Sequence, residues 1–216
     1  MRVADQQIFG LLLGNLQRAR EKLLIAQEQV SSQKRVTKPS DDPATFGQIV
    51  LDKAGLTKVA QHIRNVQFGS MRLNAVDGAL SQVHPLLSRI KELAVGARSD
   101  TNTAADRSRI AQEVRQLHRQ LLQLANTEIN GQSLFSGTRT DVPPFVLGLG
   151  DNVVYQGNNE TQSITVDENQ TVQVTVPGSQ VFTGPTTNLF DTIRDLLSAL
   201  ESNNSAGIET GIHYPV

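Results

Sequence analysis

The residues able to do chemistry in this chain are few and widely spaced. Its four histidines, His62, His84, His118 and His213, show neither the HExxH nor the H-x-H spacing of metal ligands. We expect the first three to be solvated or flanking residues on long helices. Cysteine is absent, which excludes thiolate zinc sites and cysteine nucleophiles.

Two adjacent carboxylates, Asp41 and Asp42, are candidate metal ligands. A lone acidic pair lacks the further oxygen ligands that calcium needs, so capping of the following helix is the favoured role. Gly148-Leu149-Gly150 reads as a turn rather than a phosphate loop, and the basic residues within 18–22 are too few for a nucleic-acid face. The sequence therefore predicts no enzyme, no cofactor, no metal site and no nucleic-acid partner.

Composition narrows the class of protein. The 216 residues suffice for one domain or two small ones. Aromatic residues make up only 4% and tryptophan is absent, which favours helix-on-helix packing over an aromatic core. The net charge of −1 attracts neither nucleic acid nor an anionic membrane. No apolar run is long enough for membrane insertion, and the first residues do not have the pattern of a cleaved signal peptide.

Because the sequence predicts no catalytic or metal site, its predicted helices and strands are the better guide to the class of protein. In the first segment apolar residues recur at steps of three and four, as in a coiled-coil seam, and Gly10 and Gly14 weaken the isolated helix. Either this helix pairs with a partner, or it is an amphipathic helix packed on its own domain. The seam residues are Ile8, Leu12, Leu16, Leu23 and Val30.

Residues 44–99 have the same spacing over a much longer stretch, with a shift between Leu73 and Leu80. Pro85 is expected to kink this helix or to begin a new one. A turn at residues 100–103 then leads to a third helix, which we expect to end near Asn130-Gly131 in a left-handed cap. The short connection predicts an antiparallel helical hairpin, and the length predicts an elongated rod.

After residue 133 the period changes to two. Residues 153–155, 163–166 and 171–176 are rich in β-branched side chains, and residues 167–170 read as a hairpin loop between them. Asn188 is expected to cap a further helix, and the Asn-, Ser- and Gly-rich tail to be disordered. The predicted fold is mainly α with a small antiparallel β subdomain. Its divisions are 1–43, 44–132, 133–187, 188–203 and 204–216.

A polar break at residues 31–43, which we call the joint, separates the first two helical segments. Pro39 and Pro43 each push the preceding residue out of the helical region, so no helix runs through both. Asp41 or Asp42 can cap the next helix, with Pro43 in its first turn, where a missing N–H costs nothing. The break therefore predicts a defined turn between two separate helices.

The joint resembles the characteristic turn of bacterial flagellins and of flagellin-like proteins of the hook–filament junction. Two later stretches agree with this resemblance, residues 124–145 and residues 176–193. The form typical of the junction proteins is Lys38-Pro39-Ser40-Asp41-Asp42-Pro43.

The resemblance implies an exported structural subunit of the extracellular bacterial flagellum. Such proteins leave through the flagellar type III apparatus without a cleaved signal peptide, and an export chaperone binds them. Copies of the subunit form a ring, which contacts a neighbouring hook-associated protein and flagellin. The resemblance assigns the seam residues named above to an inner coiled-coil layer. It assigns contacts between subunits to Arg35, Lys38, Pro39, Asp41, Asp42 and Pro43.

The end of the chain departs from the family, whose long C-terminal helix pairs with the N-terminal one. Residues 211–216 do not resemble that helix, which puts the pairing of the seam in doubt. Two alternative functions stay open. One is flagellin itself. The other is a secreted helical protein sensed by a host receptor, since residues 87–94 resemble the helix of flagellin that innate receptors detect.

Overall fold

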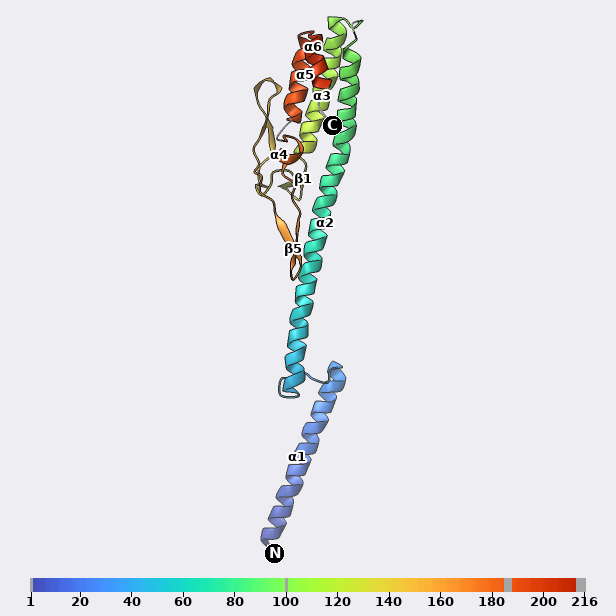
Figure 1. Cartoon of the computed structure of the whole chain (residues 1–216). Helices are drawn as coiled ribbons and strands as arrows, with labels where there is room; N and C mark the ends of the chain where they lie inside the picture. The colour runs from blue at the N-terminus through green and yellow to red at the C-terminus, as the bar shows by residue number, and fades with distance from the viewer. Residues whose placement is uncertain (1, 100, 185–187, 213–216) are drawn as a thin grey trace. The chain divides into compact units, whose positions relative to one another are not determined.

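The computed structural model describes residues 2–99, 101–184 and 188–212, with the backbone alone at residues 2–8 and 212. The chain divides into two compact parts, Met1–Ala60 and Gln61–Val216, and each is described by itself. Long helices dominate, with small antiparallel sheets between them, as predicted (Figure 1). None of the described helices is long and apolar enough to cross a membrane.

The first part contains α1, Arg2–Ser32, and the beginning of α2, Pro43–Ala97. The spacing of apolar residues predicted both helices, and the 55 residues of α2 match the predicted long segment. The large apolar side chains of α1 are not covered. Leu12, Leu16, Leu23 and Val30 are 57%, 70%, 60% and 80% exposed. The sequence left two alternatives for this helix, pairing with a partner or packing on its own domain. For these four residues, packing on their own domain is not seen.

The second part is built on the later turns of α2 and on α3, Ala104–Ala125. Arg89 contacts Glu113 at 2.8 Å, and Nε of Arg107 donates to the carbonyl of Ala97 at 3.1 Å. Ala97 comes after Arg89 in α2, whereas its partner Arg107 comes before Glu113 in α3. The two helices are therefore antiparallel, and the predicted hairpin is confirmed. Thr103 caps α3 and shares a capping box with Asp106. The buried stripe of α2 comprises Val76, Ala79, Val83, Ile90, Ala94 and Ala97.

Two shorter helices complete the helical layer. α5, Leu189–Glu201, packs on α3, and α6, Ser205–Ile212, packs on α5 (Figure 1). Asn188 caps α5 as predicted, because its side chain accepts from the backbone N–H groups of Phe190 and Asp191. The prediction of a disordered tail at 204–216 was wrong for α6, and residues 213–216 lie outside the described residues. Ile208 is fully buried, so contact with α5 orders a segment whose composition alone favours disorder.

In the described part of the chain, three two-stranded antiparallel sheets replace the single β element that the sequence predicted. They pair β1, Glu128–Ile129, with β2, Gln132–Ser133; β3, Phe145–Leu147, with β4, Val153–Tyr155; and β5, Ser163–Asp167, with β6, Gln170–Gln173. The hairpin between β5 and β6 was predicted, although β6 ends before the predicted residue 176. A turn η1, Leu149–Asp151, connects β3 to β4, and the short helix α4 is Gly178–Val181.

The sequence predicted that Asn130-Gly131 caps α3, and this prediction was wrong. α3 ends at Ala125, and Asn130 and Gly131 have φ of 52° and 73° in the turn between β1 and β2. Two successive left-handed residues match the twist of a tight hairpin, which explains the choice of Asn-Gly there.

Two helical predictions also need correction. α2 runs through Pro85, so of the two predicted outcomes there, a kink or a new helix, the new helix is excluded. The packing of Val83 and Ile90 into the core on either side holds the helix together where proline removes a hydrogen bond. His118 is fully buried rather than solvated, and its ring lies edge-on to Phe190 with centroids 5.7 Å apart.

Most of the chain's few aromatic rings gather in one cluster that joins the sheets to α5. Phe145 lies 5.4 Å from Phe182 and 5.1 Å from Phe190, between ring centroids. Gly178 makes room for this cluster, because a Cβ there would lie 2.7 Å from the Phe145 ring. The core is thus aromatic at the sheets and aliphatic along the helices.

Candidate functional site

The joint begins where α1 ends. Gln33 has a φ of 54°, the left-handed conformation that stops a helix, and its N–H points to the carbonyl of Val30 at 3.4 Å. The side-chain amide of Gln29, through Nε2, donates to the backbone carbonyl of Arg35 at 2.9 Å. The last turn of α1 therefore holds the first residues of the joint.

Asp41 organises the middle of the joint. Its Oδ2 accepts hydrogen bonds from the backbone N–H groups of Thr37 and Lys38 and from the Thr37 hydroxyl, each at 3.0 Å. The N–H of Asp41 donates to the carbonyl of Lys38 at 3.1 Å, which places Pro39 second in a tight turn, its favoured position. The hydrogen bonds from Thr37 and Lys38 hold the pKa of Asp41 below its ordinary value of 3.8.

Asp42 starts α2. Its Oδ1 accepts from the N–H of Thr45 at 3.1 Å, and its carbonyl accepts from Phe46 at 2.9 Å, so it is the cap and Pro43 is the first helical residue. Its Oδ2 accepts from the Thr45 hydroxyl at 2.7 Å and from Arg35 at 3.1 Å. These bonds, those from Thr45 first, lower the pKa of Asp42 to about 2.

Lys38 fastens the joint back onto α1. Its Nζ lies 3.0 Å from Oε2 of Glu28, in the last turns of that helix. The hydrogen bond to Glu28 and its negative charge raise the pKa of Lys38. Both side chains are about half exposed, so salt screens this pair and its contribution to stability is small.

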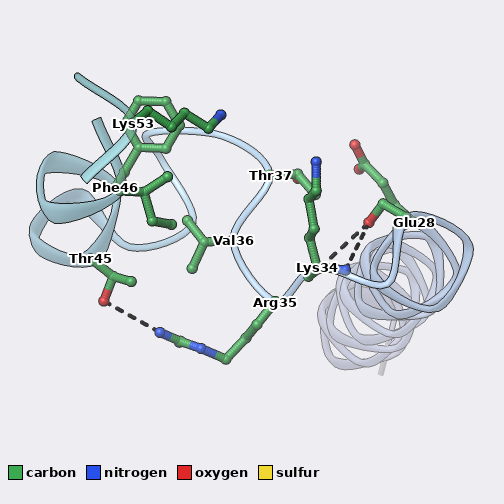
Figure 2. Close-up of a pocket in the computed structure, with 10 residues that line it drawn as sticks. Glu28, Lys34, Arg35, Val36, Thr37, Thr45, Phe46 and Lys53 are labelled. Atoms are coloured by element: carbon green, nitrogen blue, oxygen red, sulfur yellow. Dashed lines mark hydrogen bonds between the residues drawn. The ribbon is translucent and has the colours of Figure 1, made fainter. Parts of the chain in front are cut away.

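A pocket of about 660 Å³ opens between the end of α1 and the start of α2 (Figure 2). Val36, only 8% exposed, lies at its centre, with Phe46 on the α2 side and Lys34 toward α1. We call this cavity the joint pocket. Its lining residues are Glu28, Ser32, Lys34, Arg35, Val36, Thr37, Thr45, Phe46, Ile49 and Lys53.

The structure brings together six of the residues that the sequence singled out, all in the joint: Arg35, Lys38, Pro39, Asp41, Asp42 and Pro43. Leu12, Leu16, Leu23 and Val30 lie apart from them on the exposed surface of α1, and the side chain of Ile8 is outside the described residues. Sequence reasoning missed Glu28 and Thr45. Thr45 follows the capping Asp42 by three residues, a signal that was available, whereas Glu28 is ten residues from Lys38.

Over the described ranges, no group of three or more His, Cys, Asp or Glu side chains is placed to hold a metal ion. The joint holds its acidic groups by hydrogen bonds from the backbone, hydroxyl groups and Arg35. Its chemistry is that of a defined turn with a partly apolar, partly basic pocket. Such a site can position helices and bind another chain.

The family of this fold is shown by comparison with known proteins. The sequence model of the family described as the bacterial flagellin N-terminal helical region matches residues 11–140, which is more than half of the chain. The chain therefore belongs to the bacterial flagellin family. Within that family it is similar to flagellar hook-associated protein 3 of Salmonella typhimurium, at 29% identity over 189 residues, which cover 87% of this chain and 59% of the relative. The chain thus spans about three fifths of that relative's length.

Solved structures agree with this assignment. The flagellar junction protein FlgL from Legionella pneumophila is 30% identical, with a TM-score of 0.55 over 65% of this chain and 42% of that one. FlgL of Bacillus cereus is only 18% identical, but it shares the fold with a TM-score of 0.63 over 77% of this chain and 80% of that one. The mainly helical, flagellin-like fold class is confirmed.

Proposed function

We propose that this chain is a structural subunit of the bacterial flagellum that forms the ring between hook and filament. The observation that carries the proposal is the similarity to hook-associated protein 3 across 87% of the chain, joint included. The subunit acts by packing against copies of itself, and it has no catalytic role. Its other partners are a neighbouring hook-associated protein and flagellin.

The architecture supports an assembly role. α1 exposes leucines along its length, among them Leu12, Leu16 and Leu23, which fits a helix that is covered only in the assembled flagellum. The joint fixes where this helix ends and where α2 begins. We therefore propose that the seam of α1 forms the inner coiled-coil layer and that the joint contacts neighbouring subunits.

The proposal includes the route to the assembly. The subunit is exported to the extracellular flagellum by the flagellar type III apparatus, without a cleaved signal peptide, and a chaperone covers it beforehand. The apolar residues of α1 suit such a chaperone, because they would otherwise drive association before export.

A deletion strain tests the function. Removal of the gene is expected to leave hooks without filaments and to release flagellin into the medium, because filament subunits have no ring on which to assemble. Electron microscopy of the cells and the amount of flagellin in the medium are the measurements. Attached filaments of normal length would refute the proposal. Hooks that carry no filament while no flagellin appears in the medium would favour flagellin, the alternative, which the family match also admits.

The receptor-sensing alternative needs a controlled test. Arg89 forms ion pairs with Glu113 at 2.8 Å and Glu92 at 3.3 Å. Because Glu113 lies on α3, Arg89→Ala also alters a contact between two helices. A loss of receptor activation supports this alternative only if the free energy of unfolding is unchanged.

A further inference from the structure

The joint pocket has positive charge that no described carboxylate neutralises. Arg35 is paired with Asp42, and the one acidic wall residue, Glu28, is paired with Lys38. Lys34 and Lys53 make no ion pair with any carboxylate of the described residues. Figure 2 places them on opposite sides of Val36, Lys34 toward α1 and Lys53 beside the Phe46 ring.

The floor of the pocket is apolar. Val36 is buried, and Phe46 and Ile49 are half-buried beneath the charged rim. An apolar floor inside a basic rim fits an apolar side chain flanked by carboxylates, since each part of such a ligand then meets its complement. A polyphosphate or nucleic acid fits less well, because it has no apolar group for the floor.

The chain itself carries a segment with this chemistry. Residues 128–201 contain nine acidic side chains and two arginines, whereas residues 1–60 contain nine basic and six acidic side chains. Within the acidic segment, Leu149 is 98% exposed. It stands in the η1 turn, two residues before Asp151. Asp151 and Glu201 share the single guanidinium of Arg115, so this group of three side chains has a net negative charge.

The η1 turn that carries this leucine is held in place by its neighbours. Asp151 has a φ of 59°, which a residue with a side chain seldom adopts. Its carboxylate lies 3.1 Å from Nε of Arg115 on α3, and the N–H of Gly148 donates to the carbonyl of Asn152 at 2.7 Å. These contacts fix the turn between β3 and β4, so the exposed leucine is presented from a defined backbone.

We infer that Leu149 of the η1 turn, on one copy of this chain, docks into the joint pocket of a second copy. The leucine side chain lies on Val36, Phe46 and Ile49, and Lys34 and Lys53 face Asp151 and Glu201, the two carboxylates that share Arg115. This inference rests on the proposed function, because the ring brings copies of the subunit together. It names the partner surface that the assembly residues of the joint would meet.

Cross-linking between two copies tests the inference, and the natural absence of cysteine makes it clean. A Lys53→Cys chain and a Leu149→Cys chain are co-expressed in the strain that carries this protein, and its flagella are isolated and mildly oxidised. A disulfide forms only where the two Cα atoms approach within about 7 Å. We expect a shift from monomer to dimer on a non-reducing gel, reversed by reductant, and no dimer when either variant is expressed alone.

A matched pair controls for chance collisions. Gln48→Cys lies on α2 next to Ile49 but does not line the pocket, so with Leu149→Cys it is expected to give no dimer. An equal yield of dimer from this pair would overturn the docking. So would a cross-link to a protein other than this chain.

The remaining outcomes separate the inference from the function on which it rests. If both cysteine chains are present in the flagella and no dimer forms, the docking is wrong and the proposed function stands. If the unmodified chain is absent from isolated flagella, both are wrong. Leu149→Ser adds a second readout: at 98% exposure it leaves the fold intact, and it is expected to lower the amount of chain retained in the flagella.

Discussion

The guanidinium of Arg35 lies 3.1 Å from Oδ2 of Asp42, the carboxylate that also caps α2. The side chain of Asp42 thus caps α2 and also binds Arg35, in the segment that leads into this helix. Arg35 is also within 3.3 Å of the Thr45 hydroxyl. The geometry of the joint therefore depends on a few polar groups with separate tasks, which substitutions can distinguish.

The cap and the ion pair of Asp42 are separable. Asp42→Ala removes both, whereas Asp42→Asn keeps a side-chain oxygen for the N–H of Thr45 and removes the charge that faces Arg35. We expect amide hydrogen exchange in the first turn of α2 to be clearly faster in the alanine variant and nearly unchanged in the asparagine variant. Asp52→Ala, farther along the same helix, is the control. Equal exchange in the two Asp42 variants would mean that the cap is not the stabilising contact.

Acid should loosen the joint. The pKa of Asp42 is about 2 in the folded chain, below its ordinary 3.8, so the folded state favours the ionised carboxylate. The stabilisation is complete above pH 3.8 and is lost as the pH falls toward 2. NMR titration of the side-chain carboxyl carbons measures this directly. A midpoint for Asp42 near 3.8 would contradict the hydrogen bonds described here.

The buried His118 predicts a second pH dependence, at higher pH. Burial lowers its pKa from the ordinary 6.5, and Arg115 and Arg119 add to this, while Asp151 opposes it. The unfolded chain then takes up a proton that the folded chain refuses, so stability falls as the pH drops below 6.5 toward the folded-state value. We expect urea unfolding to show this loss in the natural chain and a smaller loss in His118→Leu.

The control for that experiment is His84→Leu. His84 is exposed on α2, so its replacement should leave the pH dependence of unfolding as it is. If His84→Leu and His118→Leu have the same effect, burial of His118 is not the cause.

The aromatic cluster has no room at Gly178. A Cβ there would meet the Phe145 ring at 2.7 Å and the carbonyl of Phe135 at 3.0 Å, so Gly178→Ala should lower the free energy of unfolding by about 1–3 kcal/mol. Gly78→Ala, on an open face of α2, should instead raise it by about 0.5–1 kcal/mol. Urea denaturation measures both, and a loss of stability in the two variants alike would refute the packing argument.

Local signals in the sequence predicted the elements whose causes are local. Steps of three and four located α1, α2 and α3, and the pair Asp41-Asp42 and Asn188 marked the beginnings of α2 and α5. The joint itself was found because proline and aspartate act on their neighbours, whereas its six site residues were assigned from the resemblance to the flagellin family.

Contacts between distant residues were not predictable in this way. The pairing of Lys38 with Glu28 depends on how the joint folds back, and α6 depends on the burial of Ile208 against α5. His118 lies on the buried side of α3 only because Phe190 of α5 covers it, and no spacing within α3 reports that. The sequence therefore located the joint but not its pocket.

The position of the subunit in the flagellum tests the central claim most directly. Gln112→Cys adds one exposed thiol on α3, outside the residues of the joint, to a chain that has no cysteine, so a thiol-reactive dye labels it alone. Fluorescence microscopy of labelled, filament-bearing cells is expected to show one spot at the cell-proximal end of each filament. Label distributed along the filament would contradict a junction ring and identify the chain as a filament subunit.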